Sequence, residues 1–291
     1  MMRVPIYYMF LCLLGVFITS CTASIDLKTN DSEPVIVIYG CLNEQSMYQS
    51  VRITSSSPYF EEKRNQPVSN AMVTIQSSQN EVFELEELTG EKGTYRTVKP
   101  MAAVAGITYQ LKVEVDFDQD GTLEIYEAST AMPSHYELDS IDIRVQSIMG
   151  YKHYALDIYG LEEPGDDYYL CRLIINDTIE RFKISQYIPI SDKGFDDDYM
   201  DGVILTYIND IEDYDEDEDD LLYVTSGDKI TLCTSRITKG YYDFINQCQK
   251  EKNGENPFFG GPASNITTNV SNGAVGYFTA FSTSIQKGVI P

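Results

Sequence analysis

Short runs of strand-forming residues, each bounded by turn-forming residues, recur through most of this 291-residue chain. The runs are rich in Val, Ile, Thr and Tyr, and Gly, Asn, Asp and Pro separate them. Seven of them fall within about 100 residues, a spacing typical of a β-sandwich. The predicted strands of this first region are residues 35–40, 48–54, 71–76, 81–85, 94–98, 108–115 and 124–129.

A second region begins after Met132-Pro133-Ser134, and we place a domain boundary near residue 134. It contains one predicted helix near residues 240–252, because Tyr241, Phe244, Ile245 and Cys248 follow helical spacing and Asn253-Gly254 supplies a stop. The chain is therefore predicted to be all-β, with a β-sandwich over 35–133 and a mostly antiparallel β domain with one short helix over 134–291. The predicted strands of the second region are residues 140–145, 154–159, 168–175, 178–184, 203–208, 221–225, 229–237 and 274–280.

The N-terminus has the features of an export signal that is removed. One charge, Arg3, precedes an apolar run over residues 4–17, which is shorter than the ~20 residues that span a bilayer. Ile18-Thr19-Ser20-Cys21 resembles the lipobox of bacterial lipoproteins, which implies cleavage after residue 20 and acylation of Cys21, for example with palmitate. The alternative is an ordinary secretory signal with a chance cysteine. We expect residues 21–34 to form a polar tether.

The charge of the chain limits its partners. It has 45 acidic and 21 basic residues, a net charge of −24, which repels nucleic acid and anionic lipid. Membrane attachment would therefore depend on the acyl chains of Cys21, and nucleic acid is excluded as a partner.

Two resemblances extend beyond the signal. Residues 67–75, Gly93-Thr94-Tyr95 and residues 106–111 are similar to the carboxypeptidase-regulatory, prealbumin-like sandwich, an Ig-like β-sandwich. The lipobox, residues 37–42 and 67–71, Leu138-Asp139-Ser140-Ile141, Asn265-Ile266 and Gly276-Tyr277-Phe278 together resemble a family of outer-membrane lipoproteins that contain a domain of unknown function. Genes of that family often lie beside those of TonB-dependent receptors. The resemblance carries no catalytic residue.

Residues 116–127 satisfy the spacing of a calcium-binding loop. Acids occupy positions 1, 3 and 5, glycine position 6 and glutamate position 12, so the predicted ligands of Ca²⁺ are Asp116, Asp118, Asp120, Thr122 and Glu127. The flanking segments are predicted strands, however, and not the helices of an EF-hand. The alternative is a hairpin whose turn is made by Asp120-Gly121.

Other candidate positions are weaker. Of the cysteines left after removal of the signal and acylation, Cys233 and Cys248 are the nearest pair for a disulfide, and free thiols are the alternative. The candidate ligand or partner contacts are the aromatic residues Tyr199, Tyr214, Phe258 and Phe259. The acidic run over residues 210–220 is typical of a solvated loop.

The residues favour a binding protein over an enzyme. The chain has two histidines, neither in a metal-binding spacing, and no G-x-S-x-G motif, so we assign no catalytic residue. The expected function is that of a lipid-anchored outer-membrane binding or accessory protein, on the periplasmic or cell-surface face, assisting a TonB-dependent transporter in nutrient uptake. The alternatives are a structural or adhesive surface lipoprotein and a hydrolase whose site uses acids such as Asp166-Asp167 or Asp196-Asp197-Asp198.

Overall fold

The computed structural model describes residues 34–56, 66–178, 184–193, 199–213, 222–253 and 266–291. In these segments the chain forms three β-sheets and the α-helix α2 (Lys239–Asn253), so the prediction of an all-β protein with one helix is confirmed. Short 3-10 helices occupy η2 (Ile184–Gln186) and η3 (Ile211–Asp213). Among the described residues, no helix has the length and apolar character needed to cross a membrane.

The largest sheet contains all seven strands predicted for the first region and one strand from the far end of the chain. Its hydrogen-bonded order in the described residues is β16-β1-β2-β6-β5-β4-β7-β8, and β3 pairs with β2. The strands are β1 (Ile36–Asn43), β2 (Ser50–Ser55), β3 (Gln66–Pro67), β4 (Met72–Ser77), β5 (Val82–Glu87), β6 (Thr94–Thr97), β7 (Thr108–Val115), β8 (Glu124–Ala131) and β16 (Val275–Phe281).

Alternation of side chains builds the core of this sheet. In β4, Val73 and Ile75 are buried whereas Met72 is 53% exposed, as the period of two in a strand requires. The same alternation in β1 buries Ile36, Ile38 and Leu42. These side chains join one hydrophobic cluster that also draws on β2, β6, β7, β8 and β16.

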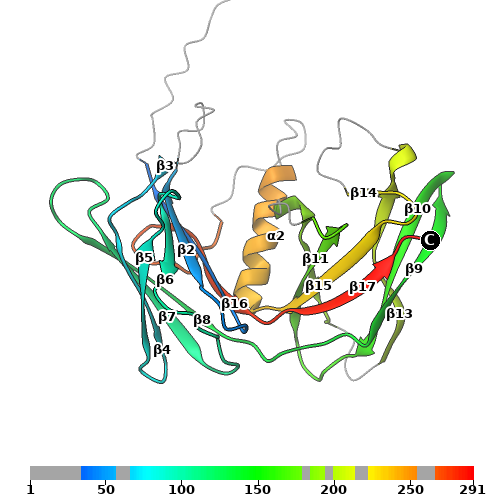
Figure 1. Ribbon diagram of the computed structural model, residues 1–291, viewed down its shortest axis with the longest axis horizontal. Coiled ribbons are helices and arrows are strands. Elements are labelled where there is room, and N and C mark those ends of the chain that lie inside the picture. The colour runs from blue at the N-terminus through cyan, green and yellow to red at the C-terminus, as the bar shows by residue number, and fades with distance from the viewer. Residues whose placement is uncertain (1–33, 57–65, 179–183, 194–198, 214–221, 254–265) are drawn as a thin grey trace, which may run out of the picture. The chain divides into compact units, whose positions relative to one another are not determined.

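Strand β16, labelled in Figure 1, pairs in parallel with β1, from Val37 opposite Val275 to Asn43 opposite Phe281. Strand β16 also contacts β8, which lies at the opposite end of the strand order. Asn269 connects these two ends, because its Nδ2 donates to the carbonyl oxygens of Ser129 (3.0 Å) and Phe278 (2.7 Å). Asn269 therefore links the two ends of the strand order through its side chain.

The predicted ranges 35–133 and 134–291 consequently share a sheet. Residues 34–291 form one compact unit, and β16 comes from the second range while its partner β1 comes from the first. Whether either range folds alone is untested, so the boundary near residue 134 stays a prediction.

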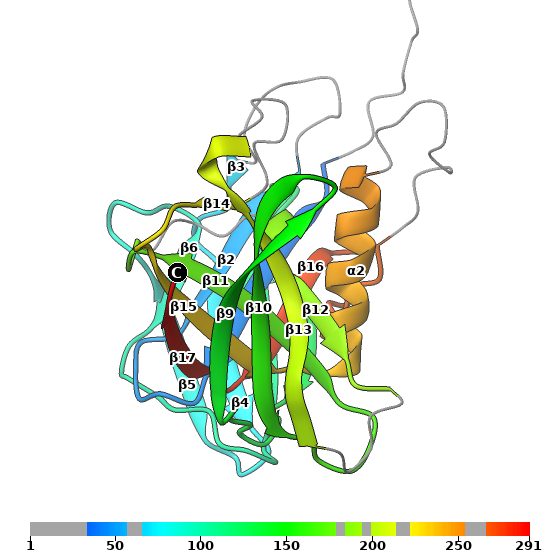
Figure 2. The ribbon, with the colours of Figure 1, turned by 90° about the vertical axis from the view of Figure 1, so that its right-hand side faces the viewer.

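The remaining strands form two four-stranded sheets in the described part of the chain. One has the order β14-β13-β10-β9 and the other β12-β11-β15-β17. Figure 2 shows β9, β10 and β13 side by side. The strands are β9 (Ser140–Ile148), β10 (Tyr151–Leu161), β11 (Tyr168–Ile175), β12 (Ile188–Ser191), β13 (Tyr199–Asp210), β14 (Tyr223–Val224), β15 (Lys229–Arg236) and β17 (Ser284–Val289).

Strand β11 is buried on both faces over most of its length, which explains an apolar sequence interrupted only by Arg172. Tyr169 and Cys171 point into the core between the two four-stranded sheets. Tyr168 and Leu170 belong instead to a third cluster, in which α2 packs against β11 and β16. The predicted apolar stripe of α2 is confirmed: Tyr241, Phe244 and Ile245 are buried there, and Cys248 is partly buried against them.

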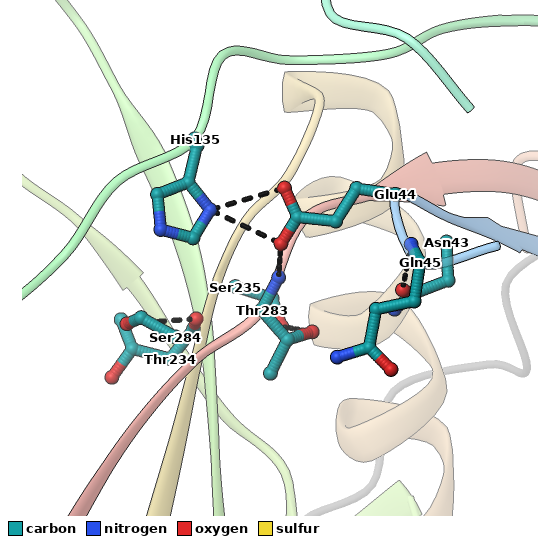
Figure 3. Close-up of polar contacts among 8 residues, drawn as sticks. All are labelled: Asn43, Glu44, Gln45, His135, Thr234, Ser235, Thr283 and Ser284. Atoms are coloured by element: carbon teal, nitrogen blue, oxygen red, sulfur yellow. Dashed lines mark hydrogen bonds and ion pairs between the residues drawn. The ribbon is translucent and has the colours of Figure 1, made fainter. Parts of the chain in front are cut away.

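A polar group fixes the chain where it passes from β16 to β17 (Figure 3). The carboxylate of Glu44, just after β1, accepts a hydrogen bond from the backbone N–H of Thr283 at 3.2 Å. The same carboxylate lies 3.1 Å from Nδ1 of His135, in the segment that leads from β8 to β9. Glu44 thus joins three segments that are far apart in the sequence.

The structure differs from the predicted strands in a few places. The predicted strand over 178–184 lies mostly outside the described residues, and Ile184 itself begins η2. Strands β3, β12 and β17 were not predicted. Each pairs with a single neighbouring strand, so its formation depends on a neighbour that the local pattern does not show.

Candidate functional site

A cavity of about 190 Å³ lies between the two four-stranded sheets. Most of its lining is apolar and comes from β10, β11, β12 and β13. Its polar lining includes Glu162, directly after β10, and Ser191 and Asp192, at the end of β12. The apolar lining residues include Leu138, Ile158, Ile190, Met200, Val203 and Leu205.

Three carboxylates gather at this cavity. One oxygen from each of Glu162, Asp167 and Asp192 lies within 4.8 Å of the others. Glu162 is 2% exposed and Asp192 is 7% exposed, so two of the three acids are almost completely removed from water. Carboxylates in that environment destabilise the fold unless a cation or hydrogen-bond donors compensate them.

The loop between β10 and β11 is fixed against β12 by a reciprocal pair of hydrogen bonds. The backbone N–H of Asp167 donates to Oδ1 of Asp192 at 2.8 Å, and the backbone N–H of Asp192 donates to the carbonyl oxygen of Asp167 at 3.3 Å. The second oxygen of Asp192, Oδ2, is buried and has no hydrogen-bond partner.

Arg236, at the end of β15, compensates part of the negative charge. Its guanidinium pairs with Asp167, and Nη1 lies 2.6 Å from Oε2 of Glu163. Burial opposes the charge of this side chain, but the hydrogen bonds to Asp167 and Glu163 raise the pKa of Arg236. The guanidinium therefore stays charged, and it forms ion pairs with Asp167 and Glu163.

Two tyrosines complete the polar end of the cavity. The rings of Tyr136 and Tyr169 have centroids 4.8 Å apart, and both line the cavity. Burial, reinforced by Glu162, raises the pKa of Tyr136 to about 12. Burial and the charge of Asp167 also raise the pKa of Tyr169. Both phenols are therefore neutral at physiological pH, and the hydroxyl of Tyr169 is buried without a hydrogen-bond partner.

The predicted calcium loop forms a second acidic group, at the hairpin between β7 and β8. Oxygens of Asp116, Asp118, Asp120 and Glu124 lie within 4.8 Å of one another. Backbone N–H groups of the loop already donate to these carboxylates, as when Gly121 donates to Oδ2 of Asp116 at 3.1 Å. Oδ1 of Asp116 is buried and has no hydrogen-bond partner.

Glu127, the expected last ligand, does not join this group. It lies in β8 opposite Lys112, exposed, with its backbone N–H bonded to Oγ of Ser271. Glu124 takes its place, because the strand begins there and keeps residue 127 extended away from the turn. Thr122 is exposed and donates its backbone N–H to Asp120.

The remaining candidate residues are dispersed. Tyr199 is exposed at the start of β13, whereas Tyr214, Phe258, Phe259 and the lipidation residue Cys21 lie outside the described residues. Cys41, Cys171, Cys233 and Cys248 are free thiols. The alternative of free thiols is therefore observed, and Cys233, on β15, and Cys248, on α2, do not form a disulfide.

Of the acids considered for hydrolysis, the two that the structure describes, Asp166 and Asp167, have separate partners. Asp166 forms an exposed ion pair with Lys193 at 3.3 Å, Asp167 pairs with Arg236, and residues 196–198 lie outside the described residues. Asp210, the first residue of the acidic run, is buried and accepts a hydrogen bond from the hydroxyl of Tyr154 at 2.8 Å. It is therefore a structural residue and not part of a solvated loop.

The sequence analysis missed Glu162 and Asp192 as site residues. Each is one acid among 45, and nothing in its local pattern distinguishes it from an exposed acid. The available signal was their position directly after an apolar run, which places a carboxylate at the end of a buried strand.

No curated protein matches the chain. The model of a family described as a domain of unknown function, DUF4249, matches residues 22–287, nearly the whole chain after Cys21. The chain therefore belongs to the DUF4249 family.

Proposed function

We propose that this chain is a lipid-anchored binding protein of the outer membrane that assists a TonB-dependent transporter in nutrient uptake. The observation that supports binding is the cavity of about 190 Å³ between the two four-stranded sheets, with an apolar lining and a few buried polar groups. Ligand sites commonly combine those two properties.

The sequence supports the proposed anchor. Cys21 follows Ile18-Thr19-Ser20 at the end of a short apolar segment, and residues 21–34 are expected to form a polar tether. Each buried methylene contributes about 0.8 kcal/mol to membrane binding, so several acyl chains would hold the protein on the membrane without a basic patch. The net charge of −24 makes such a patch an unsuitable alternative.

The anchor is tested by fractionation. Cys21→Ser is expected to leave the protein uncleaved or soluble, absent from the detergent phase, whereas Cys12→Ser, a change within the signal, should leave the mature protein in that phase. Membrane retention of Cys21→Ser equal to that of the wild type would contradict the lipoprotein assignment.

The partner is tested separately. A tagged full chain, crosslinked in cells and purified from the outer membrane, is expected to recover a TonB-dependent barrel whose gene lies beside its own. Cys21→Ser serves as the control, because it should not reach the membrane. Recovery of no outer-membrane barrel would refute the role as a transporter accessory.

A further inference from the structure

We infer that the cavity between the two four-stranded sheets binds a primary ammonium compound that carries one apolar group of about the size of a phenyl ring. The apolar lining holds the hydrophobic group, and Glu162, Asp167 and Asp192 receive the ammonium. This inference rests on the proposed binding function and specifies the chemical class of its ligand.

The cavity volume sets the size of the apolar group. An engineered apolar cavity of about 150 Å³ is enough to bind benzene. The cavity here, about 190 Å³, therefore accommodates a phenyl ring with one or two additional carbons. Its walls are the aliphatic side chains of β10, β12 and β13, which offer no hydrogen bonds to a polar group at that end.

The negative charge of the carboxylates at the polar end of the cavity favours a cationic ligand group. Asp192 is 7% exposed, its Oδ2 lacks a hydrogen-bond partner, and it lies in a group with two further carboxylates. Arg236 is engaged with Asp167 and Glu163. An additional positive charge that donates hydrogen bonds would therefore relieve both the repulsion and the missing partner of Asp192.

The spacing of the oxygens fits an ammonium. Three acceptors arranged tetrahedrally around a nitrogen, each about 2.8 Å from it, lie about 4.6 Å apart. The corresponding oxygens of Glu162, Asp167 and Asp192 lie within 4.8 Å of one another. The unpartnered hydroxyl of Tyr169 supplies a further acceptor nearby.

The surroundings favour an ammonium over a metal ion. Aromatic rings attract organic cations through their faces, and the rings of Tyr136 and Tyr169 line the cavity at this end. Calcium takes six to eight oxygen ligands, whereas Asp167 here is already paired with a guanidinium. An apolar cavity adjoining the acids serves an organic ligand and contributes nothing to a bare metal ion.

Three compounds of matched shape test the charge requirement. We would titrate the full chain, reconstituted in lipid nanodiscs at pH 7, with 2-phenylethylamine, 2-phenylethanol and 3-phenylpropanoate, and measure binding by calorimetry. We expect the amine to bind most tightly and the neutral alcohol to bind with an affinity lower by about tenfold or more, because charge-assisted hydrogen bonds contribute about 1.5–3 kcal/mol. The carboxylate should show no measurable binding.

Two variants locate the site. Asp192→Asn should reduce the affinity for the amine by about tenfold or more while leaving the affinity for the alcohol unchanged. Asp166→Asn is the matched control, because that side chain is exposed and paired with Lys193, and it should bind all three compounds as the wild type does. Val203→Phe should lower the affinity for both the amine and the alcohol, since the larger side chain fills the apolar part of the cavity.

The outcomes separate this inference from the proposed function. Equal affinity for the amine and the alcohol would overturn the ammonium preference and leave the cavity as a binding site. Calcium ions that displace the amine would overturn it in favour of a metal site at the same carboxylates, whereas calcium bound at the β7–β8 hairpin would leave amine binding unchanged. Absence of binding by all three compounds would overturn the inference, while recovery of the transporter would still test the accessory role.

Discussion

Gly276 of β16 lies directly opposite Ile38 of β1, and the two backbones approach so closely that no side chain fits between them. A Cβ atom built on residue 276 would lie 2.1 Å from the carbonyl oxygen of Ile38, and the φ angle of Gly276 is +108°. This contact joins the last part of the chain to the first strand of the large sheet. The absence of a side chain at residue 276 is therefore a condition for that sheet to form.

Gly276→Ala should destabilise the protein by about 3 kcal/mol or more, since it combines a backbone clash with a strained φ angle. Denaturant unfolding of the full chain measures the loss. Gly273→Ala is the control, because its φ is +73° but no atom lies within 4 Å of the added Cβ. That variant should lose only about 1–2 kcal/mol, and equal losses for both variants would contradict the role of the close approach.

Asn269 offers a second test, of the link between the two ends of the large sheet. Its Nδ2 donates to Ser129 and Phe278, and its Oδ1 accepts from the N–H of Phe278 at 2.9 Å. Asn269→Ala should cost about 1–3 kcal/mol, because part-buried backbone groups of β16 lose their partners. Asn80→Gly, in the exposed turn between β4 and β5, should change the unfolding free energy by much less. A loss below about 0.5 kcal/mol for Asn269→Ala would show that water replaces these bonds.

Local patterns predicted most of the strands and the helix. The alternation in β4 and the stripe of Tyr241, Phe244 and Ile245 are both set by residues within one element. The pairing partner of a strand, in contrast, is not set by its local pattern. Residues 274–280 were predicted as a strand, but their pairing with β1 depends on Gly276 meeting Ile38 from the other end of the chain.

The site was predicted less well for the same reason. Glu162 and Asp192 become neighbours only when β12 pairs with β11 and the two four-stranded sheets pack together. In the calcium-like loop, the spacing rule pointed to Glu127, whereas the hairpin register brings Glu124 to the acidic group. Chemistry that depends on register or on long-range packing is not encoded in a short motif.

Asp210 should make the protein sensitive to acid. The backbone N–H of Glu212, the ammonium of Lys152 and the hydroxyl of Tyr154 lower the pKa of Asp210 from 3.8 to about 2. A carboxyl with a lowered pKa in the folded state stabilises the fold above its unfolded pKa, and this contribution is lost as the pH falls from about 4 to about 2.

Asp210→Asn should therefore be about 1–2 kcal/mol less stable than the wild type at pH 7, and the difference should shrink between pH 4 and pH 2. Chemical unfolding at several pH values measures it. Asp243→Asn, which removes an exposed carboxylate on α2, is the control. A difference that is the same at pH 7 and pH 2 would show that the charge of Asp210 is not responsible.

Variants in the hairpin between β7 and β8 can distinguish two ligand sets for Ca²⁺, one that includes Glu124 and one that includes Glu127. If Asp116, Asp118, Asp120 and Glu124 hold Ca²⁺, millimolar Ca²⁺ should raise the melting temperature of the full chain, because a ligand that binds only the folded state stabilises it by RT ln(1 + [L]/Kd). At tenfold excess over Kd this amounts to about 1.4 kcal/mol. Magnesium should have less effect, since it demands a tighter octahedral shell and retains its waters.

Glu124→Gln should abolish the rise with Ca²⁺, whereas Glu127→Gln should retain it, because only Glu124 lies with the three aspartates. The two variants remove the same charge from neighbouring positions of one strand, so general screening of the net charge of −24 would affect them equally. If the rise survives Glu124→Gln, or if Mg²⁺ produces it equally well, the loop is a turn stabilised by its own backbone hydrogen bonds, such as that from Gly121 to Asp116.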